Sequence, residues 1–395
     1  MIPTNVDLIC LSHLRWGFVF QRPQHLMSRF ARNRRVFFIE ESVFEDAEPY
    51  LRSSVCTNTG VRVNTPVLPH GLSQQQITDC QATLLTKMVA QNSITDYIAW
   101  YYTAMALEIS SSLHPSLTVY DCMDELSAFA GAPAAMRRNE AALFHQADLV
   151  FTGGASLFES KRTRHQSVHL FPSSVDVAHF SRARSIKEGP DDQAHLPRPR
   201  LGYAGVIDER MDLDLLRHIA LARLNWQLIL LGPVVKIDPA LLPRPANIHY
   251  LGMKPYQDLP SYFSGWDIGL LPFALNESTR FISPTKTPEY LAAGLRVVSA
   301  PIRDIVMPYG DLGLVQIASD ADEFIRAADS LLAGPPDVNS LAQVDHFLSL
   351  SSWDTTWSNM NDLIEDKLAL KHLQTRATRP LTKIARVASQ GASDV

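Results

Sequence analysis

The residues best suited to chemistry lie in one stretch of the second half, Ile282–Ile302 (ISPTKTPEYLAAGLRVVSAPI). Pro284 precedes a helix that we predict over Thr285–Ala293, and a helix start offers unpaired N–H groups and the positive end of a dipole. Lys286 adds a positive charge there, and Glu289 can accept the two hydroxyls of a ribose. For any one residue, a plain helix cap with a surface lysine is the alternative. The stretch predicts a clamp for a nucleoside diphosphate, with contacts from Ser283, Thr285, Lys286 and Glu289.

This stretch resembles the donor-binding segment of nucleotide-sugar glycosyltransferases of the GT-B fold, in the large retaining class that is similar to glycosyltransferase family 4. Glu289–Val298 stands where that family has a Glu-hydrophobic-Ala-x-Gly-x-Pro-Val-Val pattern, and residues 284–290 match a Pro-x-Lys-x-x-Glu-Tyr subgroup. Two positions depart from the pattern. Phe281 replaces a glutamate that often touches the donor sugar, and Arg296 replaces the usual proline. The resemblance covers about residues 5–370 and implies two Rossmann-like domains that face a cleft, with a last helix that crosses back to the first domain.

The resemblance assigns further donor contacts to three other loops of the second half. Gly205 ends a predicted strand with small residues that let a ligand approach the backbone. Arg210, in the same loop, is implied to meet the phosphates, although a surface ion pair with a neighbouring aspartate is the alternative. Lys236 is a second phosphate candidate, and Leu251 and Gly252 are implied to contact uracil or guanine through their backbone. Lys286 and Arg210 would stabilise charge on the departing diphosphate, so we count them as catalytic.

The first half offers side chains for an acceptor. An aromatic ring with amide, guanidinium and imidazole groups suits a sugar or a lipid phosphate, and this combination follows the first predicted strand. For the histidine of this group, a structural position in the core is the alternative. The predicted acceptor contacts in this segment are Trp16, Gln21, Arg22 and His25.

Two aspartates follow the predicted strand Leu117–Tyr120, at the strand end where open parallel sheets bind ligands. Asp121 or Asp124 could orient or deprotonate an acceptor hydroxyl, and we favour Asp121 as the catalytic one and Asp124 as an acceptor contact. A helix N-cap is the alternative for Asp124. In the retaining class the leaving phosphate can itself take the proton. The resemblance also implies a leaving group held by basic residues, so we predict no metal and no cofactor, the nucleotide-sugar being a co-substrate.

Composition narrows the function classes. A chain of 395 residues with 46% hydrophobic content can form two domains. The net charge of −5 argues against a nucleic-acid partner. The four cysteines have no CxxC spacing, which speaks against a zinc ribbon or a disulfide framework. We find neither a signal peptide nor a run of about 18 apolar residues. These features predict a cytoplasmic protein, and they leave room for peripheral contact with the inner face of a membrane.

Two series of apolar strands and amphipathic helices flank a polar, proline-rich stretch (ARSIKEGPDDQAHLPRPR). Strands expected at Val6–Leu11 and Val36–Glu40 begin the first series, and strands expected at Arg200–Gly205 and Trp226–Leu231 begin the second. The predicted fold class is α/β. The predicted divisions are an acceptor domain (1–182), a linker (183–199), a donor domain (200–350), a return helix (351–374) and a disordered tail (375–395).

The predicted function is a glycosyltransferase that moves a sugar from a UDP- or GDP-sugar to a saccharide or lipid-linked acceptor, in polysaccharide or glycolipid synthesis. A catalytically weak subunit or sensor that binds the nucleotide-sugar is an alternative, suggested by Phe281. A nucleotide-sugar epimerase of the same architecture is another, although the second half has few histidines. An oxidoreductase is disfavoured because neither first strand is followed by Gly-x-Gly-x-x-Gly.

Overall fold

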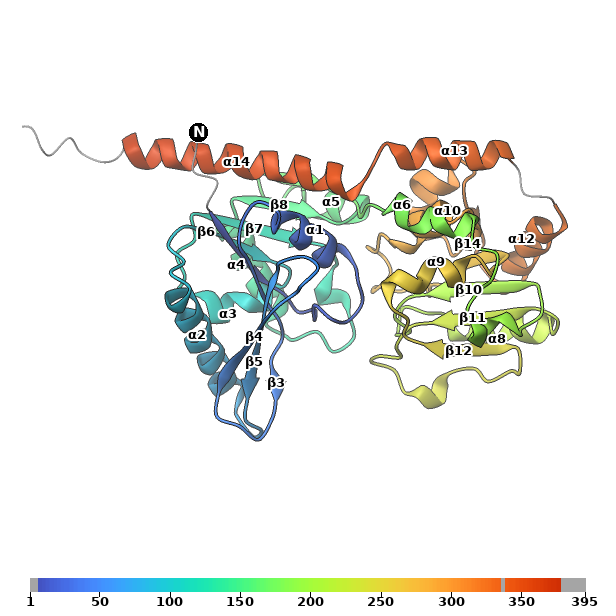
Figure 1. Ribbon diagram of the computed structural model, residues 1–395, viewed down its shortest axis with the longest axis horizontal. Helices are drawn as coiled ribbons and strands as arrows, with labels where there is room; N and C mark the ends of the chain where they lie inside the picture. Colours follow the sequence, from blue (N-terminus) through green and yellow to red (C-terminus); the bar gives the residue numbers. More distant parts are fainter. Residues whose placement is uncertain (1–5, 335–337, 378–395) are drawn as a thin grey trace, which may run out of the picture.

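A computed structural model describes residues 6–334 and 338–377 of the chain. It consists of two lobes, each built on one sheet with helices against it (Figure 1). The N-terminal lobe holds strands β1 to β9 and the C-terminal lobe holds β10 to β15. Within the described residues, no helix is long and apolar enough to cross a membrane.

The N-terminal sheet has the strand order β3-β5-β2-β1-β6-β7-β8-β9, and β4 adds to β5 as an antiparallel edge. All other pairings in this sheet are parallel. Its central strands are apolar runs buried on both faces, as expected of a parallel sheet covered by helices. The strands are β1 (Asp7–Leu11), β2 (Val36–Ile39), β3 (Val43–Phe44), β4 (Tyr50–Val55), β5 (Arg62–Leu68), β6 (Tyr97–Tyr101), β7 (Leu117–Cys122), β8 (Leu149–Thr152) and β9 (Val168–Leu170).

The C-terminal sheet is parallel throughout, with the order β12-β11-β10-β13-β14-β15. In both sheets the chain starts in the middle and builds outwards in two directions, which opens a crevice at the carboxyl ends of the strands. The strands are β10 (Arg200–Ala204), β11 (Gln227–Leu231), β12 (Ile248–Gly252), β13 (Ile268–Leu271), β14 (Arg296–Ser299) and β15 (Gln316–Ile317).

The helices connect these strands and cover the sheets. They are α1 (Arg22–Phe30), α2 (Gln74–Gln91), α3 (Leu107–Ser110), α4 (Met136–Gln146), α5 (Ala155–Lys161), α6 (Val177–Phe180), α7 (Asp191–Ala194), α8 (Leu213–Ala222), α9 (Leu259–Phe263), α10 (Lys286–Ala292), α11 (Arg303–Ile305), α12 (Ala321–Ala333), α13 (Val338–Ser349) and α14 (Trp353–Ala377). Short turns of 3-10 helix lie at Ala104–Ala106, Leu126–Ala128, Ser181–Arg184, Pro239–Leu241 and Tyr256–Asp258, and a π-type turn lies at Val306–Gly310.

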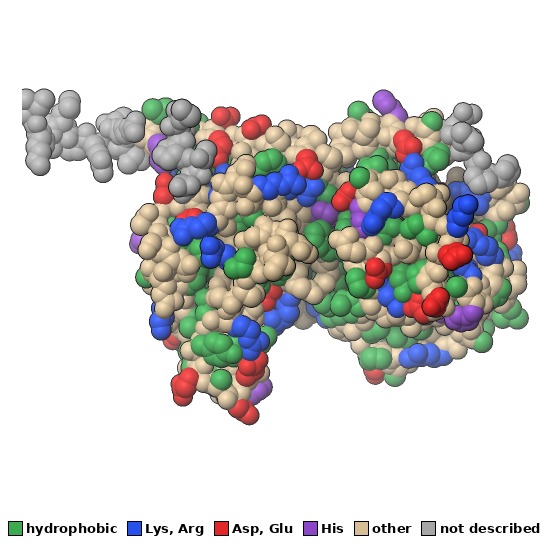
Figure 2. Space-filling model, viewed as in Figure 1, with side chains coloured by type: hydrophobic (Ala, Val, Ile, Leu, Met, Phe, Trp, Pro, Cys, Tyr) green, Lys and Arg blue, Asp and Glu red, His purple; other side chains and the backbone are tan. Residues whose placement is uncertain are grey.

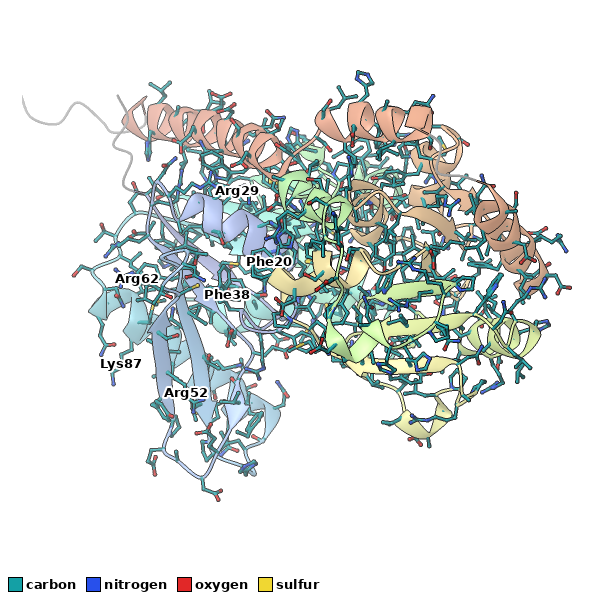
Figure 3. The ribbon with its side chains drawn as sticks, turned by 45° about the vertical axis from the view of Figure 1, so that its right-hand side comes forward. Phe20, Arg29, Phe38, Arg52, Arg62 and Lys87 are labelled. Atoms are coloured by element: carbon teal, nitrogen blue, oxygen red, sulfur yellow. The ribbon has the colours of Figure 1, made fainter. Side chains whose placement is uncertain are left out.

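The last helix returns to the first lobe, as predicted. In Figure 1, α14 runs along the N-terminal lobe, whereas α13, just before it, lies on the C-terminal lobe. The apolar face of α14 completes the core of the N-terminal lobe with four fully buried side chains, Trp353, Met360, Ile364 and Leu368. Arg34 pairs with Glu365 at 2.7 Å, and Arg29, which Figure 3 places on α1, pairs with Asp354 at 2.9 Å.

The predicted domain borders stay predictions. The stretch 183–199 lies between β9 and β10 and contains α7. Of the predicted tail, residues 375–377 belong to α14, and residues 378–395 lie outside the described part of the chain. Several elements had no counterpart in the expectations, among them β4 and α13. Strand β4 is almost wholly exposed, so it carries no alternation of apolar and polar residues that would indicate a strand.

Candidate active site

The carboxyl ends of the central strands of the two sheets contribute to one boundary between the lobes. Figure 2 shows a notch between the lobes that opens at the lower edge of the view. A cavity of about 520 Å³ lies in the N-terminal lobe, after β1 and β2. One residue of the C-terminal lobe, Lys236, also lines it. The cavity therefore borders the C-terminal lobe at Lys236.

A phenylalanine of the N-terminal lobe holds two of the predicted phosphate-binding cations. The guanidinium carbon of Arg210 lies 5.4 Å from the centre of the Phe129 ring, and the ammonium nitrogen of Lys236 lies 5.2 Å from it. Such cation–π contacts are favourable when the cation is partly desolvated. Arg210 and Lys236, which follow different strands of the C-terminal sheet, thus meet at one point of the boundary.

Arg210 also forms the ion pair that was the alternative to a phosphate contact. Its Nη2 lies 2.6 Å from Oδ2 of Asp208, and its Nε donates to the same carboxylate. Burial opposes the charge of Arg210, but the hydrogen bonds and charge of Asp208 outweigh it and raise the pKa of the arginine. The side chain is 25% exposed, and Asp208 fixes the orientation of its guanidinium.

The predicted clamp begins α10. Lys286 is the first residue of the helix, and Tyr290 anchors the helix to the sheet because its hydroxyl accepts a hydrogen bond from the Ala204 amide at 2.7 Å. The Nζ of Lys286 lies 2.9 Å from Oε2 of Glu289. Burial raises the pKa of Glu289, and Lys286 offsets part of that shift. The two residues predicted to hold phosphate and ribose therefore bind each other in this structure.

The loop before α10 faces the N-terminal lobe. A methyl group added at Gly154, which precedes α5, would come within 2.7 Å of the Ser283 Cβ and 2.3 Å of Oδ2 of Asp304. Asp304, on α11 of the C-terminal lobe, accepts a hydrogen bond from the Ser156 amide at 3.0 Å. Ser283, Thr285 and Lys286 are half-buried. The predicted clamp thus lies where the lobes meet, as the proposed chemistry requires.

Asp121 and Arg22 do not fit their predicted roles. Asp121 is 0% exposed and Arg22 is 1% exposed, and the Nη2 of Arg22 lies 2.8 Å from Oδ1 of Asp121. The Nε of Arg22 donates to both oxygens of the same carboxylate, and its Nη1 donates to the Phe171 carbonyl. An acceptor hydroxyl cannot reach this carboxylate. The pair instead fastens α1 to the end of β7, inside the N-terminal lobe.

Three other predicted acceptor residues serve local packing. Gln21 forms a capping box with Gln24 at the start of α1. Trp16 packs edge-on against Phe38, with ring centres 5.1 Å apart, in the core of the N-terminal lobe. His25 stacks on Trp353 of α14 at 4.5 Å. Burial, followed by the charge of Arg29, lowers the pKa of His25 well below its usual value, so the core reading of this histidine fits better.

Aromatic rings around His25 join the two lobes. Phe20 packs on Tyr256 of the C-terminal lobe with ring centres 4.6 Å apart, and Figure 3 places Phe20 where the lobes meet. Tyr256 also stacks on His179 at 4.3 Å. The segment that was predicted to bind an acceptor is therefore a contact between the lobes, and its aromatic content has a packing explanation.

Of the predicted acceptor contacts, Asp124 is the one that lies near the cations Arg210 and Lys236. Burial raises its pKa to about 6, while the charge of Arg210 opposes this shift and that of Asp208 reinforces it. In the C-terminal lobe, the predicted base contacts Leu251 and Gly252 lie at the end of β12, and the predicted donor contact Gly205 follows β10. Gly252 has a φ of +72°, which favours glycine. An added methyl group at Gly205 would come within 2.6 Å of the Tyr203 hydroxyl.

Sequence reasoning missed most of the polar residues of the 520 Å³ cavity, His13 and Glu41 among them. Each lies two residues beyond a strand that the apolar pattern identifies, β1 for His13 and β2 for Glu41. Their position at the carboxyl ends of central parallel strands was a usable signal. The aromatic and amide residues that follow His13 in the chain drew the prediction to Trp16, Gln21 and His25 instead.

Comparisons with known proteins agree with the fold. No family model matches the chain. The sequence is similar to the putative teichuronic acid biosynthesis glycosyltransferase TuaH of Bacillus subtilis (strain 168), with 25% identity over 234 residues. The match covers 54% of this chain and 58% of that protein, which is less than two thirds of the relative.

Three solved structures resemble the whole chain at low sequence identity. Sucrose-phosphate synthase from Thermosynechococcus elongatus has a TM-score of 0.70 and 14% identity, over 92% of this chain and 100% of that one. An E. coli trehalose-6-phosphate structure bound with UDP-2-fluoro glucose has a TM-score of 0.66 and 12% identity, over 92% of this chain and 99% of that one. Anabaena HepE in complex with UDP and glucose has a TM-score of 0.64 and 13% identity, over 91% of this chain and 99% of that one. The predicted fold, two facing Rossmann-like lobes of the GT-B type, is confirmed.

Proposed function

We propose that this protein is a glycosyltransferase that moves a sugar from a UDP- or GDP-sugar to a saccharide or lipid-linked acceptor, in polysaccharide or glycolipid synthesis. One observation carries the proposal. The cations predicted to hold a diphosphate lie on one lobe and face the other, with Lys286 paired to Glu289 and with Arg210 and Lys236 both in contact with Phe129.

The donor would replace contacts that the free protein makes with itself. Its diphosphate attracts Lys286 away from Glu289, and this frees the carboxylate to accept the ribose hydroxyls. Lys236 turns from the Phe129 ring towards the phosphates, since a charge-assisted hydrogen bond is stronger than a cation–π contact. Arg210 stays bound to Asp208 and meets the phosphates in the orientation that this carboxylate gives it. Ser283 and Thr285 contribute hydroxyls, and the backbone at Gly205, Leu251 and Gly252 receives the base.

Transfer requires stabilisation of the leaving group. As the bond between the anomeric carbon and the phosphate oxygen breaks, negative charge grows on the diphosphate, and Lys286 and Arg210 are placed to balance it. Asp208 keeps the Arg210 guanidinium in a fixed orientation through two hydrogen bonds at 2.6 and 3.0 Å. Little reorganisation is then needed when the charge develops.

The acceptor would enter the cavity of the N-terminal lobe. Ser12, Thr103 and Glu41 give it hydrogen-bonding groups, and Met105 and Phe129 give it an apolar wall. Carboxylates and hydroxyls beside an aromatic ring suit the hydroxyls and the apolar face of a sugar. The name of the B. subtilis relative, which refers to teichuronic acid biosynthesis, supports a polysaccharide as the product.

A thermal-shift panel with UDP, GDP, ADP and their sugar derivatives tests the donor. We expect one nucleotide class to raise the melting temperature of the protein, with a shift that grows with ligand concentration. The same class of sugar donor should release its nucleoside diphosphate slowly in the absence of an acceptor. A panel in which no nucleotide stabilises the protein would remove the proposed function.

A sensor or catalytically weak subunit is the second candidate, and Phe281 favours it. This side chain stands where the related enzymes often have a glutamate, and it packs against the core of the N-terminal lobe. A side chain used in this way offers no hydrogen bond to a donor sugar. Stabilisation by a nucleotide-sugar without any release of nucleoside diphosphate would support the sensor over the enzyme.

A further inference from the structure

The charge of the chain changes abruptly near the end of α14. Residues 367–395, here called the basic segment, contain six lysines and arginines and one acidic residue, so their net charge is +5. The whole chain carries −5, and subtracting the +5 of the basic segment leaves −10 for residues 1–366. A block of one charge is typical of a segment that binds an oppositely charged partner. The six cations are Lys367, Lys371, Arg376, Arg379, Lys383 and Arg386.

Two leucines lie on the outward face of α14 within the basic segment. Leu370 is 56% exposed and Leu373 is 62% exposed, whereas Leu368 is fully buried in the core of the lobe. Residues three apart on a helix are neighbours, so the two exposed leucines lie together, and Lys367 lies one turn before Leu370 on the same side. Figure 1 shows that the end of α14 projects past the rest of the N-terminal lobe. The helix therefore presents apolar and positively charged groups to its surroundings.

The sequence after α14 has the same composition. Residues 378–387 read TRPLTKIARV, in which three large aliphatic residues alternate with three cations and no acidic residue occurs. Segments of this kind bind the surface of a bilayer, because the cations meet the anionic headgroups and the aliphatic side chains enter the boundary with the acyl chains. A nucleic acid would attract the cations through its phosphates and give the aliphatic side chains no partner. The composition favours a lipid surface.

Helix α14 places the basic segment at the end of the N-terminal lobe that is opposite the boundary between the lobes. The helix begins where Trp353 stacks on His25, in the first turn of α1, with ring centres 4.5 Å apart. Because α1 follows β1, this is the carboxyl edge of the sheet. Further along, Nζ of Lys371 lies 2.7 Å from Oδ2 of Asp148, the residue before β8, at the amino edge. A surface bound there leaves the boundary between the lobes open.

We propose that the end of α14 and the residues after it bind the surface of a bilayer that contains anionic lipids. Leu370 and Leu373 enter the boundary between headgroups and acyl chains, and the cations of the basic segment meet the lipid phosphates. The contact holds the protein on the membrane without a segment that crosses it. The inference goes beyond the proposed function and does not use the nucleotide site, so either can fail while the other stands.

The first test is co-sedimentation of the full-length protein with vesicles of phosphatidylcholine, with and without phosphatidylglycerol, at physiological ionic strength. We expect binding to the vesicles that contain phosphatidylglycerol and none to pure phosphatidylcholine. The binding should weaken as salt is raised, because salt screens the attraction between the cations and the headgroups. The inference is wrong if the anionic vesicles leave the protein in the supernatant, or if both kinds of vesicle bind it equally.

The second test removes the apolar contact. Leu370→Ser combined with Leu373→Ser should weaken binding to the anionic vesicles about tenfold, since two aliphatic side chains no longer enter the bilayer. The matched control is Leu221→Ser combined with Leu224→Ser, which changes leucines of the C-terminal lobe that are 59% and 73% exposed. The control should bind as wild type. Equal affinities of the two variants would overturn the inference. So would gel filtration, without vesicles, of a wild-type dimer that the first variant dissociates, because the leucines would then join two copies of the chain.

The third test reverses charge. Lys383→Glu combined with Arg386→Glu should lower the affinity for the anionic vesicles about 100-fold or more, because each cation near such a surface adds to the attraction. Arg138→Glu combined with Arg326→Glu changes the net charge equally, at side chains that are 77% and 68% exposed, and should retain most of the affinity. Equal losses would mean that net charge alone attracts the protein. Binding of a short DNA duplex as tight as that of the vesicles would show a general site for polyanions. Either result would overturn the inference.

Discussion

Replacing Asp121 by asparagine is expected to lower the free energy of unfolding by about 3–5 kcal/mol, the usual effect of removing one partner of a buried ion pair. The substitution preserves the shape of the side chain but leaves the Arg22 guanidinium, which is 1% exposed, without a counter-charge. Urea unfolding should show a lower midpoint with an unchanged slope. The loss should appear equally in the presence and absence of acceptor, since no acceptor reaches this pair.

The matched control is Asp354→Asn. Asp354 pairs with Arg29 and Arg32 at 2.9 and 2.7 Å but is 56% exposed, so its loss should cost no more than about 1 kcal/mol. If the Asp121→Asn protein is as stable as wild type and binds the donor but no longer transfers the sugar, Asp121 has the catalytic role that the sequence suggested.

Replacing Lys286 by methionine is expected to reduce turnover about 100- to 1000-fold, the range seen when one donor to a developing negative charge is removed. Methionine keeps most of the length of the side chain and removes the charge. Nucleotide binding should weaken much less than turnover, because the charge matters most as the diphosphate departs. Turnover at saturating donor and nucleotide affinity, measured separately, check this division.

Lys87→Met serves as the control, because Lys87 lies on the exposed side of α2, in the N-terminal lobe and away from Lys286, and Figure 3 shows it at the edge of that lobe. Equal losses in the two variants would mean that the charge of Lys286 has no special place in the reaction. A loss of nucleotide binding as large as the loss of turnover would make Lys286 a binding residue only.

The sequence predicted what local patterns encode. Apolar runs such as Asp7–Leu11 and Gln227–Leu231 are buried strands because a parallel sheet covered on both faces leaves no polar side. The start of α10 at Lys286 followed from Pro284 and from the composition of the segment after it. Each of these features lies within one helix or strand, so the residues next to one another in the chain are enough to predict it.

The roles of polar residues depended on partners far away in the chain. Arg22 and Asp121 are 99 residues apart, and no pattern near either one indicates that they bind each other. His25 is held by Trp353, from the other end of the chain. A polar residue after a strand can bind a ligand or fasten another element. Only the packing of the whole lobe decides between these roles, as it did for Asp121.

The return of α14 has a consequence for protein engineering. Because Trp353, Met360, Ile364 and Leu368 fill the core of the N-terminal lobe, α14 belongs structurally to the first lobe although it follows the second in the chain. A chimera that exchanges the C-terminal half at the connection near residue 190 would import a foreign helix into that core. Exchange of donor specificity between homologues should therefore transplant residues 200–350 as a cassette and keep the host's own helix.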